Sequence, residues 1–147
     1  MMTSPELENL VRLGHLKREP CSQRDFDNLV KSGTARLNDA ANPAISIEGR
    51  FDLAYNAAHA LALAALRHGG YRSENRYVVF QALAHTLGLS AETWRVLAKA
   101  HERRNLAEYD GVLDMDERLL QDVMAAAQVV LKGVRGLPPL EGPKKKS

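Results

Sequence analysis

The sequence contains very little cysteine and no long apolar run, and each absence excludes a class of protein. Cys21 is the single cysteine among 147 residues, so no disulfide can form within the chain, and a reducing, cytoplasmic compartment is expected. No stretch approaches the roughly 18 consecutive apolar residues of a transmembrane helix, so no membrane association is expected. The first residues include acids where a secretory signal peptide has bases followed by an apolar run.

The chain also lacks an excess of charge of one sign. Its 20 Lys and Arg residues face 18 Asp and Glu residues, giving a formal net charge of +2. This value is too small to indicate nucleic-acid binding by bulk electrostatics alone. Hydrophobic residues make up 45% and charged residues 26%, the balance of an ordinary globular protein, and the length fits one domain.

Strand patterns and internal repeats are nearly absent, whereas alanine is abundant, which favours helix. Capping residues and apolar periodicity predict an all-α, up-and-down bundle of about five to six helices. The longest of these begins after Ser46 and ends at Gly69, long enough to form the spine of the bundle. The expected helices span about 5–13, 22–41, 47–68, 74–87, 91–110 and 114–135.

These elements predict three parts of the chain. Residues 1–21 form an N-terminal helix and a connection, and residues 22–135 form the bundle. Residues 136–147, rich in proline, glycine and lysine, have little to bury and are expected to be disordered or loosely docked.

Several common catalytic and metal-binding patterns are missing. The histidines and Cys21 form no zinc-type spacing, and the sequence has neither a glycine-rich phosphate loop nor a nucleophile elbow. We therefore expect no metal and no cofactor. His59, on the alanine-rich spine, is expected to be a packing residue rather than a ligand.

One pattern suggests DNA binding. Ala84, Gly88 and Leu97 are spaced as in a helix-turn-helix motif, in which a small residue permits close packing and glycine makes the turn. This alternative predicts salt-sensitive binding to duplex DNA that depends on Arg95 and Lys99.

A second pattern lies near the end of the fifth expected helix. There, Arg104 and Asn105 precede Tyr109 in the run Arg-Asn-Leu-Ala-Glu-Tyr. Together with the spine segment 50–58, the Gly-Tyr turn at 70–71 and the last amphipathic helix, this run resembles the HEPN family. That family comprises small helical proteins of prokaryotic toxin–antitoxin and defence systems. Its motif is an arginine, a polar residue and, a few residues later, a histidine; Tyr109 matches branches with tyrosine at that position.

The resemblance implies a homodimer in which two motif helices meet at a cleft, with a small nucleotidyltransferase as a frequent partner. Active members of the family cleave RNA without metal: the arginine stabilises the phosphate and the histidine takes part in acid–base chemistry. Carried over, Arg104 and Tyr109 are the candidate catalytic residues. Arg104, Asn105 and Arg103 are the candidate residues for binding phosphate or nucleic acid.

The tyrosine favours binding over cleavage. An unperturbed tyrosine has a pKa near 10 and is a poor base at neutral pH, although it can donate a hydrogen bond. His101 precedes Arg104 and does not simply replace the histidine of the motif. Arg104 and Tyr109 are also five positions apart, about 140° around a helix, so they cooperate only across a dimer or a distorted helix end.

The sequence therefore predicts a HEPN-like component of a paired prokaryotic system that binds RNA or nucleotide phosphate, with metal-independent ribonuclease activity as an open question. A plainer alternative is a non-enzymatic helical interaction module. In that case Arg103, Arg104 and Lys99 form a solvated basic patch, and Arg104 pairs with Glu108 one turn later.

Overall fold

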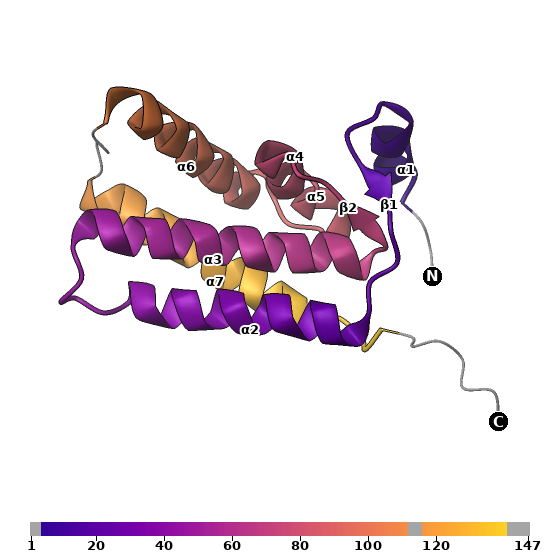
Figure 1. The fold of residues 1–147 in the computed structure, drawn as a ribbon, viewed down its shortest axis with the longest axis horizontal. Coiled ribbons are helices and arrows are strands. Elements are labelled where there is room, and N and C mark those ends of the chain that lie inside the picture. Colours follow the sequence, from indigo (N-terminus) through magenta and orange to yellow (C-terminus); the bar gives the residue numbers. More distant parts are fainter. Residues whose placement is uncertain (1–3, 112–115, 141–147) are drawn as a thin grey trace.

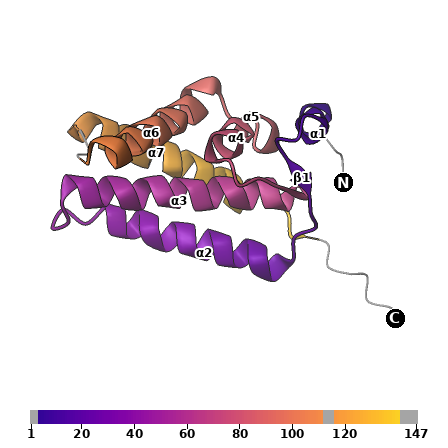
Figure 2. The same cartoon turned by 45° about the horizontal axis from the view of Figure 1, so that its top comes forward.

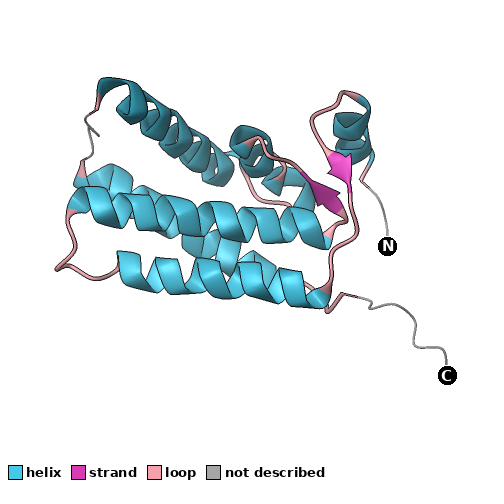
Figure 3. Ribbon diagram, in the orientation of Figure 1, coloured by secondary structure: helices cyan, strands magenta, loops and turns pink. Residues whose placement is uncertain are grey.

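A computed structural model of the chain describes residues 4–111 and 116–140 and confirms an all-α helical bundle (Figure 1). The helices are supplemented by one pair of two-residue strands, which Figure 3 shows beside the N-terminal helix. In chain order the elements are α1 (Pro5–Arg12), β1 (Lys17–Arg18), α2 (Gln23–Ala40), α3 (Ile47–His68), β2 (Tyr71–Arg72), α4 (Arg76–Gln81), α5 (Leu83–Thr86), α6 (Ala91–Asp110) and α7 (Glu117–Arg135).

Helix α3 is the centre of the bundle. It packs most extensively against α2 and α7, while α6 packs mainly against α4 and α7 (Figures 1 and 2). Many of its buried residues are alanines, whose short side chains permit neighbouring helices to approach closely. At Gly33 of α2, an added Cβ would lie 2.6 Å from Cγ of Leu61 on α3, so a larger residue there would force the contact between the two helices to shift.

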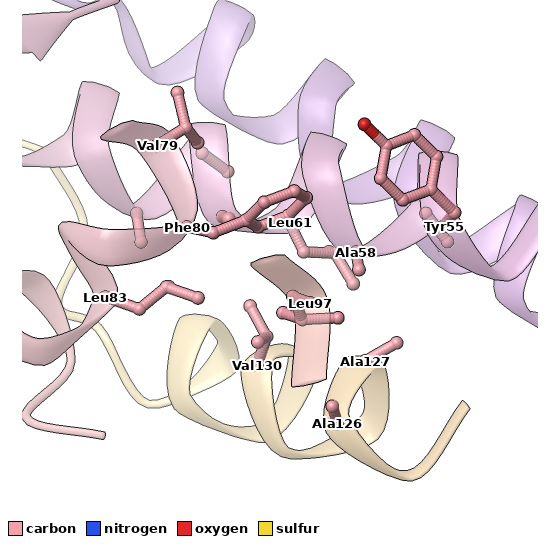
Figure 4. Close-up of a cluster of buried hydrophobic side chains, with 14 of the residues drawn as sticks. Tyr55, Ala58, Leu61, Val79, Phe80, Leu83, Leu97, Ala126, Ala127 and Val130 are labelled. Carbon is pink, nitrogen blue, oxygen red and sulfur yellow. The ribbon is translucent and has the colours of Figure 1, made fainter. Parts of the chain in front are cut away.

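The hydrophobic core lies where α3, α4, α5, α6 and α7 meet (Figure 4). Leu61, Phe80, Leu83, Leu97 and Val130 are fully buried there, one from each helix. Burial of such side chains is the main source of folding free energy. It also determines which side of α6 faces inward.

The helix boundaries predicted from capping residues are largely confirmed. The hydroxyls of Ser4, Ser22 and Ser46 accept hydrogen bonds from backbone N–H groups in the first turns of α1, α2 and α3. Helix α7 begins at Glu117, and its N-cap Asp116 accepts a hydrogen bond of 2.7 Å from the N–H of Leu119. The expected start of this helix at residue 114 lies outside the described residues.

The single helix predicted over residues 74–87 is wrong. The chain forms α4 after an Asn75 cap and then the single turn α5, with Ala82 between them. No glycine or proline marks the break, but Phe80 and Leu83 on either side of it are both fully buried. Tertiary packing therefore overrides the local helix preference.

The strand pair is a second difference from the sequence expectation. Lys17 pairs with Arg72 and Arg18 with Tyr71 in antiparallel register. Two-residue strands leave no periodic pattern in a sequence, so this pairing comes from the docking of Leu16 and Tyr71, which are both buried.

The described start of the C-terminal segment contacts the bundle. The N–H of Leu140 donates a 2.7 Å hydrogen bond to Oε1 of Gln23, and Nε2 of His68 lies 2.7 Å from the carbonyl oxygen of Pro138. The lysine-rich residues of the predicted tail lie within 141–147, outside the described residues. Among the helices of the described part, none has both the length and the apolar character to cross a membrane.

Candidate functional site

Helix α6 carries the Arg-Asn-x3-Tyr motif in its second half. The helix ends at Gly111, which adopts a left-handed conformation with φ 73° and donates its N–H to the carbonyl of Ala107. Leu97 and Ala100 are buried, so the first half of the helix is anchored in the core. The motif follows immediately after this anchor.

Arg104 points toward α3 and forms an ion pair with Asp52. Its NH1 atom lies 2.8 Å from Oδ1 of Asp52, and the two side chains are 36% and 44% exposed. Oδ1 itself is shielded from solvent and has no hydrogen-bond partner in the described part of the chain, so its contact with Arg104 is an ion pair without hydrogen-bond geometry. The pair thus joins Arg104 to a neighbouring helix rather than to the next turn of its own helix.

One turn earlier on α6, His101 contacts Tyr55 of α3. Nδ1 of His101 and the hydroxyl of Tyr55 are 2.9 Å apart, and the two rings are stacked with an angle of 16° between their planes. Nε2 of His101 lies 3.3 Å from the side-chain nitrogen of Asn105. With this amide orientation, Asn105 donates to Nε2, and Nδ1–H donates to the tyrosine oxygen.

The pKa values of this pair keep both groups neutral at neutral pH. Burial lowers the pKa of His101, and the nearby charge of Arg76 adds to that effect. Burial raises the pKa of Tyr55, with Arg76 opposing it. His101 therefore offers a neutral imidazole, the form that acts as a hydrogen-bond acceptor or a base.

Arg76 of α4 contacts two polar residues of α3, Tyr55 and Asn56. Its guanidinium is 5.3 Å from the centre of the Tyr55 ring, and NH1 donates a 3.1 Å hydrogen bond to Oδ1 of Asn56. The Asn56 amide in turn donates a 2.8 Å hydrogen bond to the carbonyl of Asp52. Arg76 is thereby held beside the Tyr55–His101 pair.

Tyr109 lies on a different side of α6 from Arg104. It is 93% exposed and lines an open groove of about 670 Å³ between α6 and the start of α4. Asn105 and His101 line the same groove, with Arg95 and Lys99 further along.

The structure thus separates the predicted site residues into groups. Asn105 and Tyr109 lie together at the groove, and Arg104 is directed toward Asp52. Arg103 is partly buried and does not line the groove. The expectation that Arg104 and Tyr109 do not share a face within one chain agrees with this arrangement.

Sequence reasoning missed the partners on α3. Asp52, Asn56 and His59 are spaced by four and three residues in the alanine-rich middle of the helix, with Tyr55 beside them, and this spacing is a signal of a polar stripe. Arg76 carries no such signal, because α4 brings it to the stripe only in the folded chain.

The structure also bears on two other kinds of site, a helix-turn-helix and a metal site. The first helix of the proposed helix-turn-helix is reduced to α5, a single turn of four residues. The guanidinium of Arg95 lies 5.6 Å from the centre of the Trp94 ring. Within residues 4–111 and 116–140, no three His, Cys, Asp or Glu side chains are grouped as a metal ion would require.

Comparisons of this chain with protein-family models, curated proteins and solved structures found no match.

Proposed function

We propose that this protein is a HEPN-like component of a prokaryotic toxin–antitoxin or defence pair that binds RNA or nucleotide phosphate on α6. The proposal rests on the motif residues of α6 and on the chemistry of the groove beside them. A small nucleotidyltransferase is the partner class that the family resemblance suggests. Binding, rather than cleavage, is the primary activity that we assign.

The observation that carries the proposal is the composition of the α6 groove. Arg95 and Lys99 supply two positive charges against the single carboxylate of Glu102. Tyr77 and Tyr109 supply exposed aromatic rings at the same groove. Cations for the phosphates combined with aromatic rings for stacking are typical of surfaces that bind single-stranded nucleic acid.

Arg104 is suited to a phosphate near the groove. The Arg104 side chain is about one-third exposed, so a phosphate can share its guanidinium with Asp52. The ion pair also restrains the side chain before a ligand arrives, which reduces the entropic cost of binding. A planar guanidinium bonds phosphate through two parallel N–H groups.

A homodimer is supported by the apolar character of the same surface. Tyr77, Leu106 and Tyr109 are exposed large side chains that all line the groove. Exposed apolar patches of this kind mark interaction surfaces, and two-fold dimers are the commonest oligomers. In such a dimer, Arg104 of one protomer can act with Tyr109 of its partner.

Ribonuclease activity depends on a base. Tyr109 is almost fully exposed and makes no hydrogen bond or ion pair with any other described residue. The described residues therefore provide no partner that would take up the proton of its hydroxyl. The neutral imidazole of His101 is the better candidate on the same face.

The test combines binding and cleavage of a fluorescently labelled single-stranded RNA in EDTA. We expect wild-type protein to bind with an affinity that falls as salt rises. Arg104→Ala should weaken binding about tenfold, the loss typical of a charge-assisted contact. Arg118→Ala, which removes an exposed arginine on α7, is the matched control for net charge and should bind like wild type.

Cleavage by Tyr109→His alone would support a HEPN-like cleft whose natural form binds without cutting. Cleavage by wild type that disappears in Arg104→Ala would extend the proposal to a metal-independent ribonuclease. Equal binding by wild type and Arg104→Ala, or no RNA binding by wild type, would overturn the proposal. Sedimentation equilibrium of wild type and Leu106→Glu tests the dimer: the substitution should shift the protein toward monomer.

A further inference from the structure

A second groove, separate from the groove on α6, runs along α3, and Arg76 lines it. It has a volume of about 740 Å³ and is bordered by α2, α3 and the segment that joins β2 to α4. Helix α3 contributes His59, Leu63 and Arg67 to it, at successive turns. The groove therefore follows α3 for two turns, about 12 Å.

Three arginines and three carboxylates line this groove, so their formal charges balance, but the ion pairs there involve only Arg67 and Arg72. Oε2 of Glu19 lies 3.2 Å from Arg67 and 3.5 Å from Arg72, and Glu74 lies 3.3 Å from Arg72. Arg67 also donates hydrogen bonds to the carbonyls of Glu19 and Pro20, so it is committed to structure. These two arginines are thus already occupied.

Arg76 differs from them because the described chain provides it with no carboxylate. Its contacts are the neutral amide of Asn56 and the face of the Tyr55 ring. The side chain is half-buried, so its positive charge is partly removed from water. An uncompensated cation in this setting is costly, and an anion that pairs with it recovers that cost.

His59 provides a second hydrogen-bonding group beside Arg76. Its ring packs edge-on against Phe80, with 6.0 Å between the ring centres, and neither nitrogen has a hydrogen-bond partner among the described residues. Burial is the main cause that lowers the pKa of His59 to about 4, and the positive charge of Arg76 adds to it. The imidazole is therefore neutral at pH 7, and its one N–H is available to an oxyanion.

The rest of the groove suits the remainder of a small ligand. Leu29 of α2 and Leu63 of α3 provide an apolar wall, while Asp25 and Asn28 of α2 provide acceptors and an amide donor. Sugar hydroxyls and base N–H groups are complementary to such acceptors, and a base ring is complementary to the leucines.

We propose that this groove binds a nucleoside monophosphate, with the phosphate on Arg76 and His59 and the nucleoside along Leu29 and Leu63 toward Asp25 and Asn28. The site is separate from the RNA-binding groove on α6 and does not depend on Arg104. Its ligand is distinguished from free phosphate by the contribution of the nucleoside.

The experiment is a titration of the full-length protein with three probes: adenosine 5′-monophosphate, inorganic phosphate and adenosine. Binding is followed by calorimetry and by the histidine ring signals in ¹H–¹³C NMR spectra. We expect the monophosphate to bind more tightly than phosphate, adenosine not to bind measurably, and the His59 signals to shift with both phosphate-bearing probes. Equal binding of adenosine and its monophosphate, or unmoved His59 signals at millimolar probe, would overturn the proposal.

Variants separate the two ends of the site. Arg76→Gln should weaken binding of both phosphate-bearing probes about tenfold or more. Asn28→Ala should weaken binding of the monophosphate but leave inorganic phosphate unchanged; Asn28 is exposed, so this variant should fold normally. Unchanged affinities in Arg76→Gln would contradict the proposal.

Two further variants distinguish binding at the α3 groove from binding at the α6 groove. Arg104→Ala should keep the shift of the His59 signals that the monophosphate causes, even if RNA binding is lost. If thermal melting shows that Arg76→Gln is poorly folded, Arg76→Lys replaces it. That variant keeps the charge without the two-pronged geometry, so it should retain weakened binding, and wild-type affinity in Arg76→Lys would count against the site.

Discussion

Oδ1 of Asp52 on α3 lies 2.8 Å from NH1 of Arg104 on α6, and one turn away the Tyr55 hydroxyl lies 2.9 Å from Nδ1 of His101. The residue numbers rise along α3 as they fall along α6, so these paired contacts join two antiparallel helices. Arg104, the arginine of the sequence motif, is therefore held by α3, a helix about fifty residues earlier in the chain.

Replacing Asp52 by alanine should have little effect on stability. Both members of the ion pair are more than one-third exposed, and exposed pairs contribute up to about 1 kcal/mol. The free energy of unfolding, measured in urea, should therefore fall by no more than that amount. A double-mutant cycle with Arg104→Ala isolates the pair, and a coupling of several kcal/mol would show that it is stronger than its exposure indicates.

Tyr55→Phe should cost about 1 kcal/mol, because it removes one partly buried hydrogen bond and keeps the packed ring. Urea unfolding measures the loss. Tyr77→Phe, at an exposed tyrosine, is the matched control and should change the free energy of unfolding by less than about 0.5 kcal/mol. Equal effects in both variants would mean that the contact with His101 contributes nothing.

Stability should rise with pH between about 4 and 6.5 because of His59. Its pKa is lowered from 6.5 to about 4 in the folded protein, so the unfolded chain binds more protons in this range. The contribution, on the order of 3 kcal/mol, is fully present above the unfolded pKa and is lost as pH falls toward the folded value.

His59→Gln should flatten this part of the pH profile of unfolding free energy, while His15→Gln, at an exposed histidine, should leave it unchanged. An NMR titration of His59 gives the folded pKa directly. A value near 6.5 would rule out this origin of the pH dependence.

Gly33→Ala should destabilise the protein although alanine is the better helix former. The added methyl group would meet Cγ of the fully buried Leu61 at 2.6 Å, and overpacking of this kind costs about 1–3 kcal/mol. The gain in helix propensity of about 1 kcal/mol does not offset the upper part of that range.

Gly133→Ala is the matched control for Gly33, because it also lies within a helix. There the new Cβ would lie 3.0 Å from Cδ1 of the half-buried Leu87, the end of a flexible side chain, so the loss should be smaller. Thermal melts of both variants compare them. A Gly33→Ala protein as stable as wild type would show that the overpacking against Leu61 costs no more than the gain in helix propensity.

The sequence predicts only some residues of the candidate site. Asn105 and Tyr109 were identified from the motif, and they do line one groove. Asp52, Tyr55 and Arg76 were not assigned to a site, because their roles arise from helix packing between segments far apart in the chain.

Local patterns in the sequence predict the helical class and most helix ends. Ser4, Ser22 and Ser46 cap helices by accepting hydrogen bonds from backbone N–H groups in the turn that follows each serine. Because these contacts are local, a short stretch of sequence is enough to predict them. Three features arise only from tertiary packing: the break at Ala82, the β1–β2 pairing and the side of α6 on which each polar residue lies. The break and the orientation of α6 depend on the burial of Phe80, Leu83 and Leu97, and the strand pairing depends on the docking of Leu16 and Tyr71. The free energy of this burial is gained only when distant segments meet.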